Sequence, residues 1–134
     1  MHYTIWDYLD GGVNEGVVTL SGAVTPDRDK KGDLYKKIAR IPGVRDYVDR
    51  VEILSVSLAD ERIRANIANR IYRSSHFDRY RAQIHPPFAI IVNNSVVTLK
   101  GYIGDQIEYM EIERLIIQMG NIIRVDNQLE VLKR

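Results

Sequence analysis

The residues with the clearest chemical potential are arginines and aromatic residues that alternate between Ser57 and Phe88. The stretch holds six arginines against three acidic residues, which leaves a local net charge of +3. The arginines are Arg62, Arg64, Arg70, Arg73, Arg79 and Arg81, and the interleaved rings are Tyr72, Phe77, Tyr80 and Phe88. Guanidinium groups pair bidentately with phosphate, and aromatic rings favour the interface between lipid headgroups and acyl chains. The stretch therefore has the chemistry that binding of anionic phospholipid requires.

Arg70, Arg73 and Arg79 are the best candidates for such a lipid-binding site, because helical spacing and loop position are expected to leave their heads in solvent. Phe77 or Tyr80 would supply the interfacial ring. Two other interpretations stay open. Arginine and tyrosine are also enriched in protein–protein interfaces, and a charged helix face can simply keep a helix soluble while its aromatic neighbours pack inward.

Other chemically capable residues lack the partners that a metal or a reaction would need. The chain has no cysteine, which excludes disulfides, thiolate metal sites and a cysteine nucleophile. His2, His76 and His85 do not have the spacing of metal ligands. Ser21-Gly22 lacks one flanking glycine of a nucleophile elbow, and no motif places a His–acid pair beside it.

Glycine-rich segments give no sign of nucleotide binding either. Gly11, Gly12 and Gly16 are not followed by the Lys-Ser/Thr pair of a phosphate-binding loop, and hairpin turns explain them. The sequence therefore predicts a non-enzymatic protein with no catalytic residues, no metal site and no cofactor.

Composition restricts the partners further. The net charge is +1, from 19 basic and 18 acidic residues, so no global field recruits nucleic acid, and the predicted order of elements fits no nucleic-acid-binding fold. No stretch reaches the roughly 18 consecutive apolar residues of a membrane span. Residues 1–4 contain no apolar run and hence no signal peptide, so the chain is expected to be either cytosolic or a mature or trimmed form.

The elements that must position these residues are organised as a repeat. Val17–Gly22 reads VVTLSG and returns as Val96–Gly101, VVTLKG, at an offset of 79 positions. Tyr47–Leu54 lines up with Val125–Leu132 at an offset of 78. One residue of slippage is what two copies of one folding unit would accumulate.

The first copy is predicted to contain a strand at 3–9, a turn at 10–16, a strand at 17–25, a helix opened by Pro26-Asp27 and a strand at 45–56. The apolar stripe of its helix consists of Leu34, Ile38 and Ile41. Strand alternation predicts that Val18 and Leu20 are buried against Leu34 and Ile38.

The second copy is predicted to begin with a helix from the capping residue Ser57 to about Arg73, in which the stem of Arg64 is packed and its head is either paired or at the rim. A hairpin at 88–92 and 96–102, a helix capped by Asp105 and a strand at 122–132 follow. By the same alternation, Val97 and Leu99 should be buried against Leu115 and Ile116.

The predicted fold class is therefore α+β, with two repeated small units, each a three-stranded mixed sheet packed on helices. Their element orders are ββαβ for residues 1–56 and αββαβ for residues 57–134, since the first unit lacks the leading helix. A unit of about 60 residues is marginal alone, because it buries only about 60% of its unfolded surface. We therefore expect the two units to pack together and share some core.

The order and repetition of these motifs resemble the BON domain, named for bacterial osmotic-shock and nodulation proteins. The resemblance is carried by the apolar-Val-Thr-Leu-polar-Gly strand, an amphipathic helix, Gly-Val and an Asp/Asn-x-apolar strand, in two copies. Asp60–Arg64, Pro86-Pro87-Phe88 and Ile90–Asn93 resemble tandem-BON envelope proteins in particular. Two departures lie in the second copy, where Ser95 stands in place of the usual glycine and Asn121-Ile122 replaces Gly43-Val44.

The resemblance implies a periplasmic or other extracytoplasmic setting in a bacterium, with a cytoplasmic one still open, and it implies no catalysis. Members of the family are thought to bind phospholipid or envelope surfaces, or to connect to other envelope proteins. The expected partner is thus an anionic phospholipid or membrane surface. The alternative is a protein–protein or scaffolding role, with another envelope protein or a further copy of the chain as the partner.

Overall fold

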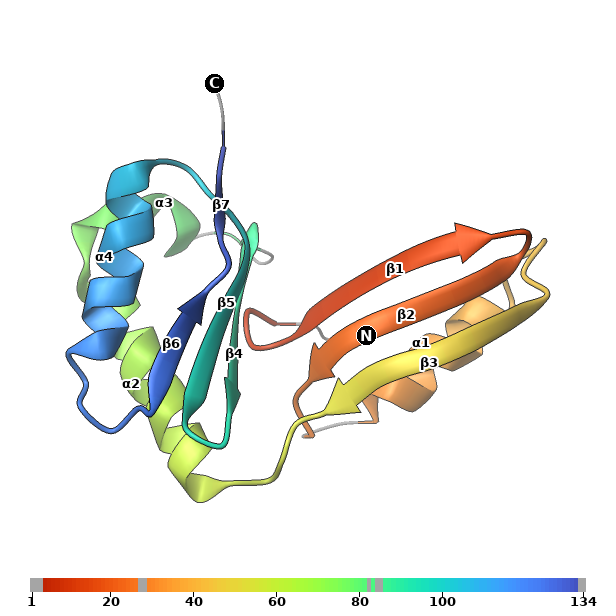
Figure 1. The fold of residues 1–134 in the computed structure, drawn as a ribbon, viewed down its shortest axis with the longest axis horizontal. Helices are drawn as coiled ribbons and strands as arrows, with labels where there is room; N and C mark the ends of the chain where they lie inside the picture. Colours follow the sequence, from red (N-terminus) through yellow and green to blue (C-terminus); the bar gives the residue numbers. More distant parts are fainter. Residues whose placement is uncertain (1–3, 27–28, 82, 84–85, 133–134) are drawn as a thin grey trace.

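The chain forms two mixed β-sheets with helices, an α+β architecture, in the computed structural model (Figure 1). The structure describes residues 4–26, 29–81, 83 and 86–132. The predictions that concern His2, Tyr3, Asp27 and His85 fall outside these ranges, as does the side chain of Arg81.

The first sheet consists of β1 (Tyr8–Asn14), β2 (Val17–Val24) and β3 (Asp46–Ile53), in that spatial order. β1 and β2 form an antiparallel hairpin, and β2 pairs with β3 in parallel. A parallel pair needs a crossover connection, which α1 (Lys30–Ala39) provides. α1 lies across β2 and β3, and β1 extends beyond it (Figure 1).

The second sheet has the same pairing pattern. β4 (Phe88–Asn93) and β5 (Val96–Ile103) are antiparallel, and β5 pairs in parallel with β6 (Arg124–Asn127) and β7 (Glu130–Val131). Two long helices accompany it, α2 (Leu58–Arg73) before the hairpin and α4 (Gln106–Ile117) after it. Between α2 and β4 lie the short 3₁₀ turn Ser75–Phe77 and α3 (Asp78–Arg81).

Helix starts follow the predicted capping residues. The side chain of Ser57 accepts a hydrogen bond from the Asp60 N–H, and that of Asp105 accepts one from the Glu108 N–H. In the first unit the cap is Asp29, whose side chain accepts from the Gly32 N–H, so α1 begins at Lys30. Of the predicted helix start, Pro26 lies in a turn and Asp27 falls outside the described residues.

The prediction for the first strand was wrong in position. Residues 4–7 form a turn in which the Asp7 carboxylate accepts hydrogen bonds from the Thr4 N–H and hydroxyl, so the strand starts only at Tyr8. Gly11, assigned to a turn from the sequence, lies within β1. A Cβ there would stand 2.8 Å from Cδ2 of Leu20, so the Leu20 side chain would have to shift to admit a larger residue.

The last strand is interrupted, contrary to the single strand predicted for 122–132. The Asn127 side chain accepts a hydrogen bond from the Leu129 N–H, which diverts the backbone between β6 and β7. The Gln128 N–H still donates to the carbonyl of Leu99, so the segment remains attached to β5.

The main core lies between the second sheet and its two helices. Val97 and Leu99 are fully buried there, with Ile116 from α4 and Ile63 and Ile67 from α2. This confirms the predicted burial of Val97, Leu99 and Ile116, whereas Leu115 is only partly buried at the rim of the core.

The first sheet is less completely covered than predicted. Val18 and Leu20 are only half-buried, as is Leu34, although Ile38 is buried. The reason is that only α1 packs on this face among the described residues, while the second sheet has two helices. A second small core forms instead on the opposite face, where Ala23 and Leu54 meet Ala89 and Ile91 of β4.

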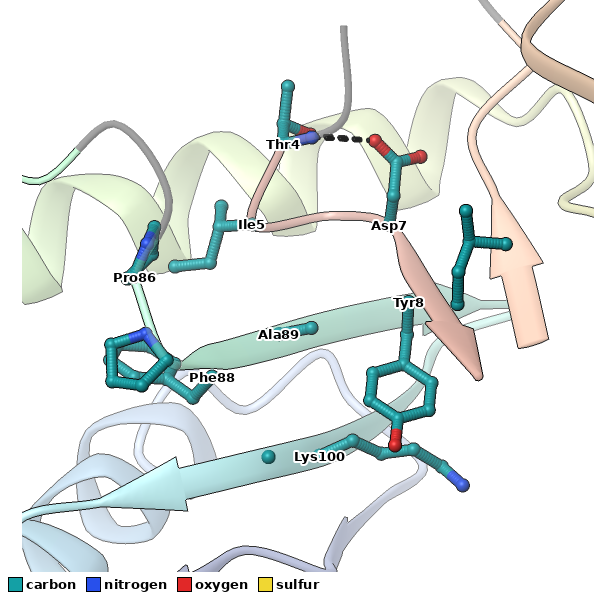
Figure 2. A pocket seen from close by; sticks show the side chains of 11 residues that line it. Thr4, Ile5, Asp7, Tyr8, Pro86, Phe88, Ala89 and Lys100 are labelled. Atoms are coloured by element: carbon teal, nitrogen blue, oxygen red, sulfur yellow. Dashed lines mark hydrogen bonds between the residues drawn. The ribbon is translucent and has the colours of Figure 1, made fainter. Parts of the chain in front are cut away.

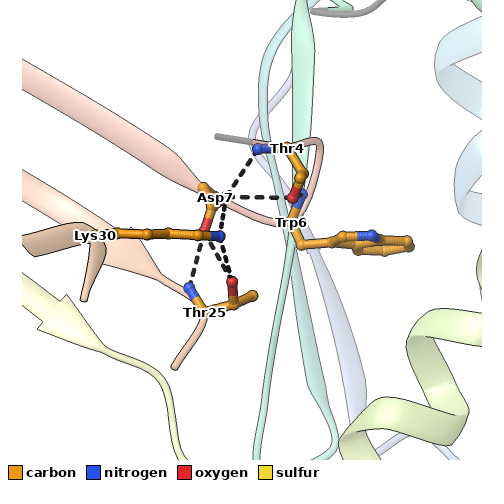
Figure 3. Close-up of polar contacts among 5 residues, drawn as sticks. All are labelled: Thr4, Trp6, Asp7, Thr25 and Lys30. Carbon is orange, nitrogen blue, oxygen red and sulfur yellow. Dashed lines mark hydrogen bonds and ion pairs between the residues drawn. The ribbon is translucent and has the colours of Figure 1, made fainter. Parts of the chain in front are cut away.

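A buried polar cluster holds the start of the chain between the two sheets (Figure 3). Lys30 Nζ lies 2.8 Å from Asp7 Oδ2 and 2.6 Å from the hydroxyl of Thr25, and the Thr25 N–H donates to Asp7 Oδ1. The side chains of Lys30 and Asp7 are only 2% and 1% exposed. The carbonyl of Ile5, two residues before Asp7, accepts a hydrogen bond from the Ile90 N–H at 2.6 Å. The cluster therefore couples α1 and β2 to the edge of the second sheet.

Unequal burial of two equivalent leucines gives a first prediction. Leu99→Ala should lower the free energy of unfolding by about 2–5 kcal/mol, as truncation of a fully buried leucine does. Leu20→Ala should cost clearly less, because Leu20 is only partly buried. Urea denaturation of both variants measures the difference, and equal losses would contradict the unequal cover of the two sheets.

The buried ion pair gives a second prediction. Asp7→Ala should cost about 3–5 kcal/mol, because it leaves the Lys30 ammonium buried without its carboxylate. The double variant Asp7→Ala/Lys30→Met removes both charges and should be more stable than Asp7→Ala alone. A double-mutant cycle in thermal or urea unfolding checks this, and a double variant that is the least stable of the set would refute it.

Candidate functional site

The arginine-rich stretch is carried by α2, whose inner side is fixed to the second sheet. Ile63 and Ile67 are each 1% exposed in the core. The carboxylate of Asp60, fully buried, accepts hydrogen bonds from the backbone N–H groups of Asn94 and Ser95 in the β4–β5 turn. α2 is thus held at its first turn as well as along its length, and its orientation on the sheet is defined.

Two arginines of α2 contribute to this packing. Arg64 Nη2 donates to the carbonyl of Val92 at 2.8 Å, so its head is paired, one of the two arrangements predicted for it. Arg70 Nη1 lies 3.4 Å from the carbonyl of Leu115 in α4, and the residue is partly buried. Arg70 therefore faces the α2–α4 contact, and its head is less available for a ligand than the sequence suggested.

The two rings proposed as interfacial anchors are buried, so this part of the prediction was wrong. Phe77 is 1% exposed and Tyr80 is 8% exposed. The ring of Tyr80 meets that of Phe88 edge-on, with centroids 5.1 Å apart. Neither ring can enter a lipid interface from this position, because both fill the core below the loop after α2.

Arg79 also has a structural contact. Its guanidinium lies 2.5 Å from the carboxylate of Glu108, whose other oxygen accepts a hydrogen bond from the Tyr80 hydroxyl at 2.8 Å. Burial raises the pKa of the Tyr80 hydroxyl, and the hydrogen bond to Glu108 raises it further, so Tyr80 remains a donor at neutral pH. Arg79, Tyr80 and Glu108 thus join the loop to α4.

The outward side of α2 carries a different set of residues. With about 100° of rotation per residue, six exposed positions fall within an arc of roughly 100°. We call them the outer face of α2: Leu58, Arg62, Ala65, Asn69, Tyr72 and Arg73. Leu58 is 65% exposed and Tyr72 is 57% exposed, so two large apolar groups lie beside the guanidinium groups of Arg62 and Arg73.

Of the predicted site residues, the structure leaves only Arg73 fully on this outer face. Leu58, Arg62 and Tyr72 were not among the predicted site residues, although the signal was present. A helical wheel drawn from Ser57 to Arg73 separates them from Ile63 and Ile67 without any structural knowledge. A helical wheel could not predict the burial of Phe77 and Tyr80, because both residues lie beyond the end of α2.

A small pocket lies at the junction of the two sheets, between residues 4–9 and the β4–β5 hairpin (Figure 2). Its volume is about 230 Å³. Lys100 Nζ lies 5.2 Å from the centre of the Tyr8 ring, so a cation–π contact occupies one wall. The pocket is smaller than the roughly 300–1,000 Å³ of typical small-molecule sites. We therefore interpret it as a gap in the packing between the two sheets, not as a ligand site.

A wider groove runs between α1 and the edge strand β3, with a volume of about 510 Å³. The rings of Tyr35 and Tyr47 stack in it at 4.4 Å, and the Tyr35 hydroxyl donates to Asp49. Burial acts to raise the pKa of the Asp49 carboxyl, but hydrogen bonds from Lys31, Tyr35 and the Val51 N–H outweigh it and hold the pKa below its ordinary value. Asp49 is thus an ionised structural acceptor here, unsuited to act as a general acid.

Among the described residues, no group of three or more His, Cys, Asp or Glu side chains is placed to hold a metal ion. In the same residues, no helix has the length and apolar character needed to cross a membrane. The arrangement with most potential for binding is therefore the outer face of α2, where cationic and apolar groups are exposed together.

Two solved structures and one family model are similar to this chain. No curated protein matches the chain. Among solved structures, the C-terminal domain of CdsD, a structural protein of the type III secretion system of Chlamydia trachomatis, is 16% identical with a TM-score of 0.42. That match covers 93% of this chain, which spans 57% of the CdsD chain. A second CdsD structure is 13% identical with a TM-score of 0.32, and the match covers 92% of this chain and 85% of that one.

The comparison with family models is more specific. The model of the BON domain matches residues 59–133, which run from the first turn of α2 to the end of the second sheet. This range is more than half of the chain and contains both helices of the main core. The chain therefore belongs to the BON domain family.

Proposed function

We propose that this protein is a non-catalytic envelope protein that binds anionic phospholipid surfaces through the outer face of α2. The observation that carries the proposal is the exposure of Tyr72 and Leu58 beside Arg62 and Arg73 on one side of a rigidly held helix. The same features fit the phospholipid and envelope-surface binding that the family resemblance implies.

The chemistry of this face suits a headgroup region. Guanidinium groups are weakly hydrated and pair bidentately with phosphate. Tyr72 and Leu58 offer apolar surface that can enter the upper acyl region while the tyrosine hydroxyl remains among the headgroups. Because the inner side of α2 is fixed by Asp60, Ile63 and Ile67, the helix can present these groups without rearranging.

We further propose that residues 1–56 are a first BON domain without the leading helix, followed by a second one at 57–134. The equal strand pairing of the two sheets supports this. Gly22 and Gly101 both have positive φ and approach a backbone carbonyl, of Tyr8 and Pro87 respectively. Asp49 and Asn127 each accept a hydrogen bond from the N–H two residues later.

The extracytoplasmic, envelope location is part of the proposal and rests on the family. A protein–protein role in the envelope is the second candidate, and one observation favours it. Several large apolar side chains on the first sheet and on α4 are exposed, Val13 by 74% and Ile107 by 65%. Such side chains are common at interaction surfaces.

Co-sedimentation with phosphatidylglycerol liposomes tests the lipid proposal. Each basic residue near an anionic surface contributes about 1 kcal/mol, so Arg62→Ser/Arg73→Ser should weaken binding roughly thirtyfold. Tyr72→Ser should weaken it further, and high salt should release the protein because surface charge is screened. Thermal stability should hardly change, since the three side chains are exposed.

Arg45→Ser/Arg50→Ser is the matched control, because it removes the same charge from exposed positions directly before β3 and within it. It should sediment like the parent protein. Arg79→Ser should lower stability more than lipid affinity, since Arg79 is paired with Glu108. Equal losses in the outer-face and control variants, or no sedimentation of the parent, would rule out the outer face of α2 as a lipid site.

A further inference from the structure

The two sheets can be compared position by position, because their hairpins share one register. Leu9 stands opposite Gly22 in the first hairpin, and Phe88 stands opposite Gly101 in the second. Counting along the strands, Val13 then corresponds to Val92. Val92 is fully buried beneath α2, whereas Val13 is 74% exposed. The surface of the second sheet that α2 covers thus has a counterpart on the first sheet that no described residue covers.

The same open place borders one side of α1. Tyr35 points toward β3, where its hydroxyl meets Asp49, so the side of α1 that carries Leu34 is directed toward β1. Ile41 follows directly after the C-cap residue of this helix. Ile41 is 53% exposed and Leu34 is half-buried. We call Val13, Leu20, Leu34 and Ile41 the open face.

The open face has a basic border. The exposed outer side of α1 carries Lys36 and Lys37, with Arg40 at its C-cap, against Asp33 in its first turn and Asp29 at its N-cap. Lys37 is adjacent to Leu34 by helical position, three residues further along α1. An apolar strip with a basic border suits a helix whose own apolar stripe is bordered by acidic residues. Two open faces facing each other would bring like charges together, which disfavours a symmetric pairing.

Such a stripe is exposed on α4 of the same chain. Ile107, Met110 and Ile117 are 65%, 61% and 59% exposed, and they fall within an arc of roughly 80°. Glu111 and Glu113 border the two sides of this arc. Arg114 falls within the arc, and its guanidinium is paired with the carboxylate of Glu111. We call Ile107, Met110 and Ile117 the α4 stripe. A 12-residue helix is about 18 Å long, which is comparable to the roughly 23 Å of the seven-residue strand β1.

We propose that the open face of one copy of this protein binds the α4 stripe of a second copy, with Lys37 and Arg40 of the first near Glu113 of the second. The two surfaces lie on different units of the chain, so the contact is heterologous and joins copies head to tail. The α4 helix of the second copy takes the position on the first sheet that α2 takes on the second sheet. This association is independent of lipid binding by the outer face of α2.

Sedimentation velocity of the full chain across a wide concentration range, without lipid, tests the proposal. The parent protein should form concentration-dependent oligomers. Val13→Glu and Met110→Glu should each weaken association by tenfold or more, because each places a carboxylate in the apolar contact. Both residues are exposed, so folding should be preserved, which circular dichroism checks. Val56→Glu is the control, since Val56 is 85% exposed in the linker and belongs to neither surface.

Mixing the two variants separates head-to-tail contact from other modes. Val13→Glu retains its α4 stripe and Met110→Glu retains its open face, so an equimolar mixture should form a 1:1 dimer and nothing larger. A parent that stays monomeric at all concentrations would overturn the proposal. So would a mixture that stays monomeric, or an association that Val13→Glu abolishes and Met110→Glu leaves intact.

Discussion

A small mixed sheet has one apolar face that must be covered by helices. The number of helices that pack on each sheet of this protein determines how completely that face is buried. The second sheet has two helices, so Val92, Val97 and Leu99 are removed from water completely. The first sheet, with the same strand pairing, has only α1 among the described residues, and Val18 and Leu20 remain half-exposed. Since hydrophobic stabilisation scales with buried apolar area, the two halves cannot be equally stable.

Other contacts offset this deficit. The carboxylate of Asp7 accepts hydrogen bonds from the N–H groups of Thr4 and Thr25 and pairs with the ammonium of Lys30. These contacts connect α1 and the end of β2 to residues 4–7. Ile5 continues the link to β4, and the small apolar core around Ala23 and Ala89 closes the junction. The first half is thus supported from its outer face by the second half, while part of its helix-bearing face stays open. That asymmetry leaves apolar side chains of the first sheet, such as Val13, exposed.

The sequence predicted the parts that local chemistry specifies. The caps at Ser57 and Asp105 are single-residue signals, and the repeat of VVTLSG as VVTLKG located both hairpins. The turn closed by Asp7 was missed, because its strength comes from Thr25 and Lys30, which are 18 and 23 positions away.

The candidate site was predicted less well, for a similar reason. Phe77 and Tyr80 look like exposed loop residues until Glu108, 28 positions after Tyr80, is placed beside the Tyr80 hydroxyl. Tyr72 and Arg62 required no long-range information, since the helical period alone places them with Arg73. The sequence therefore could not predict contacts between residues far apart in the chain. It could predict which residues share one face of a helix.

Native-state hydrogen exchange of the dilute full chain tests the unequal cover of the two sheets most directly, because amide opening free energies range from near zero to the global value within one protein. The equivalent amides of Val13 and Val92, and of Leu20 and Leu99, are the pairs to compare. The account predicts that the β1–β2 amides open at a clearly lower free energy than their partners in β4 and β5. Equal opening free energies in both pairs of amides would contradict it, since the first sheet would then be as well protected as the second.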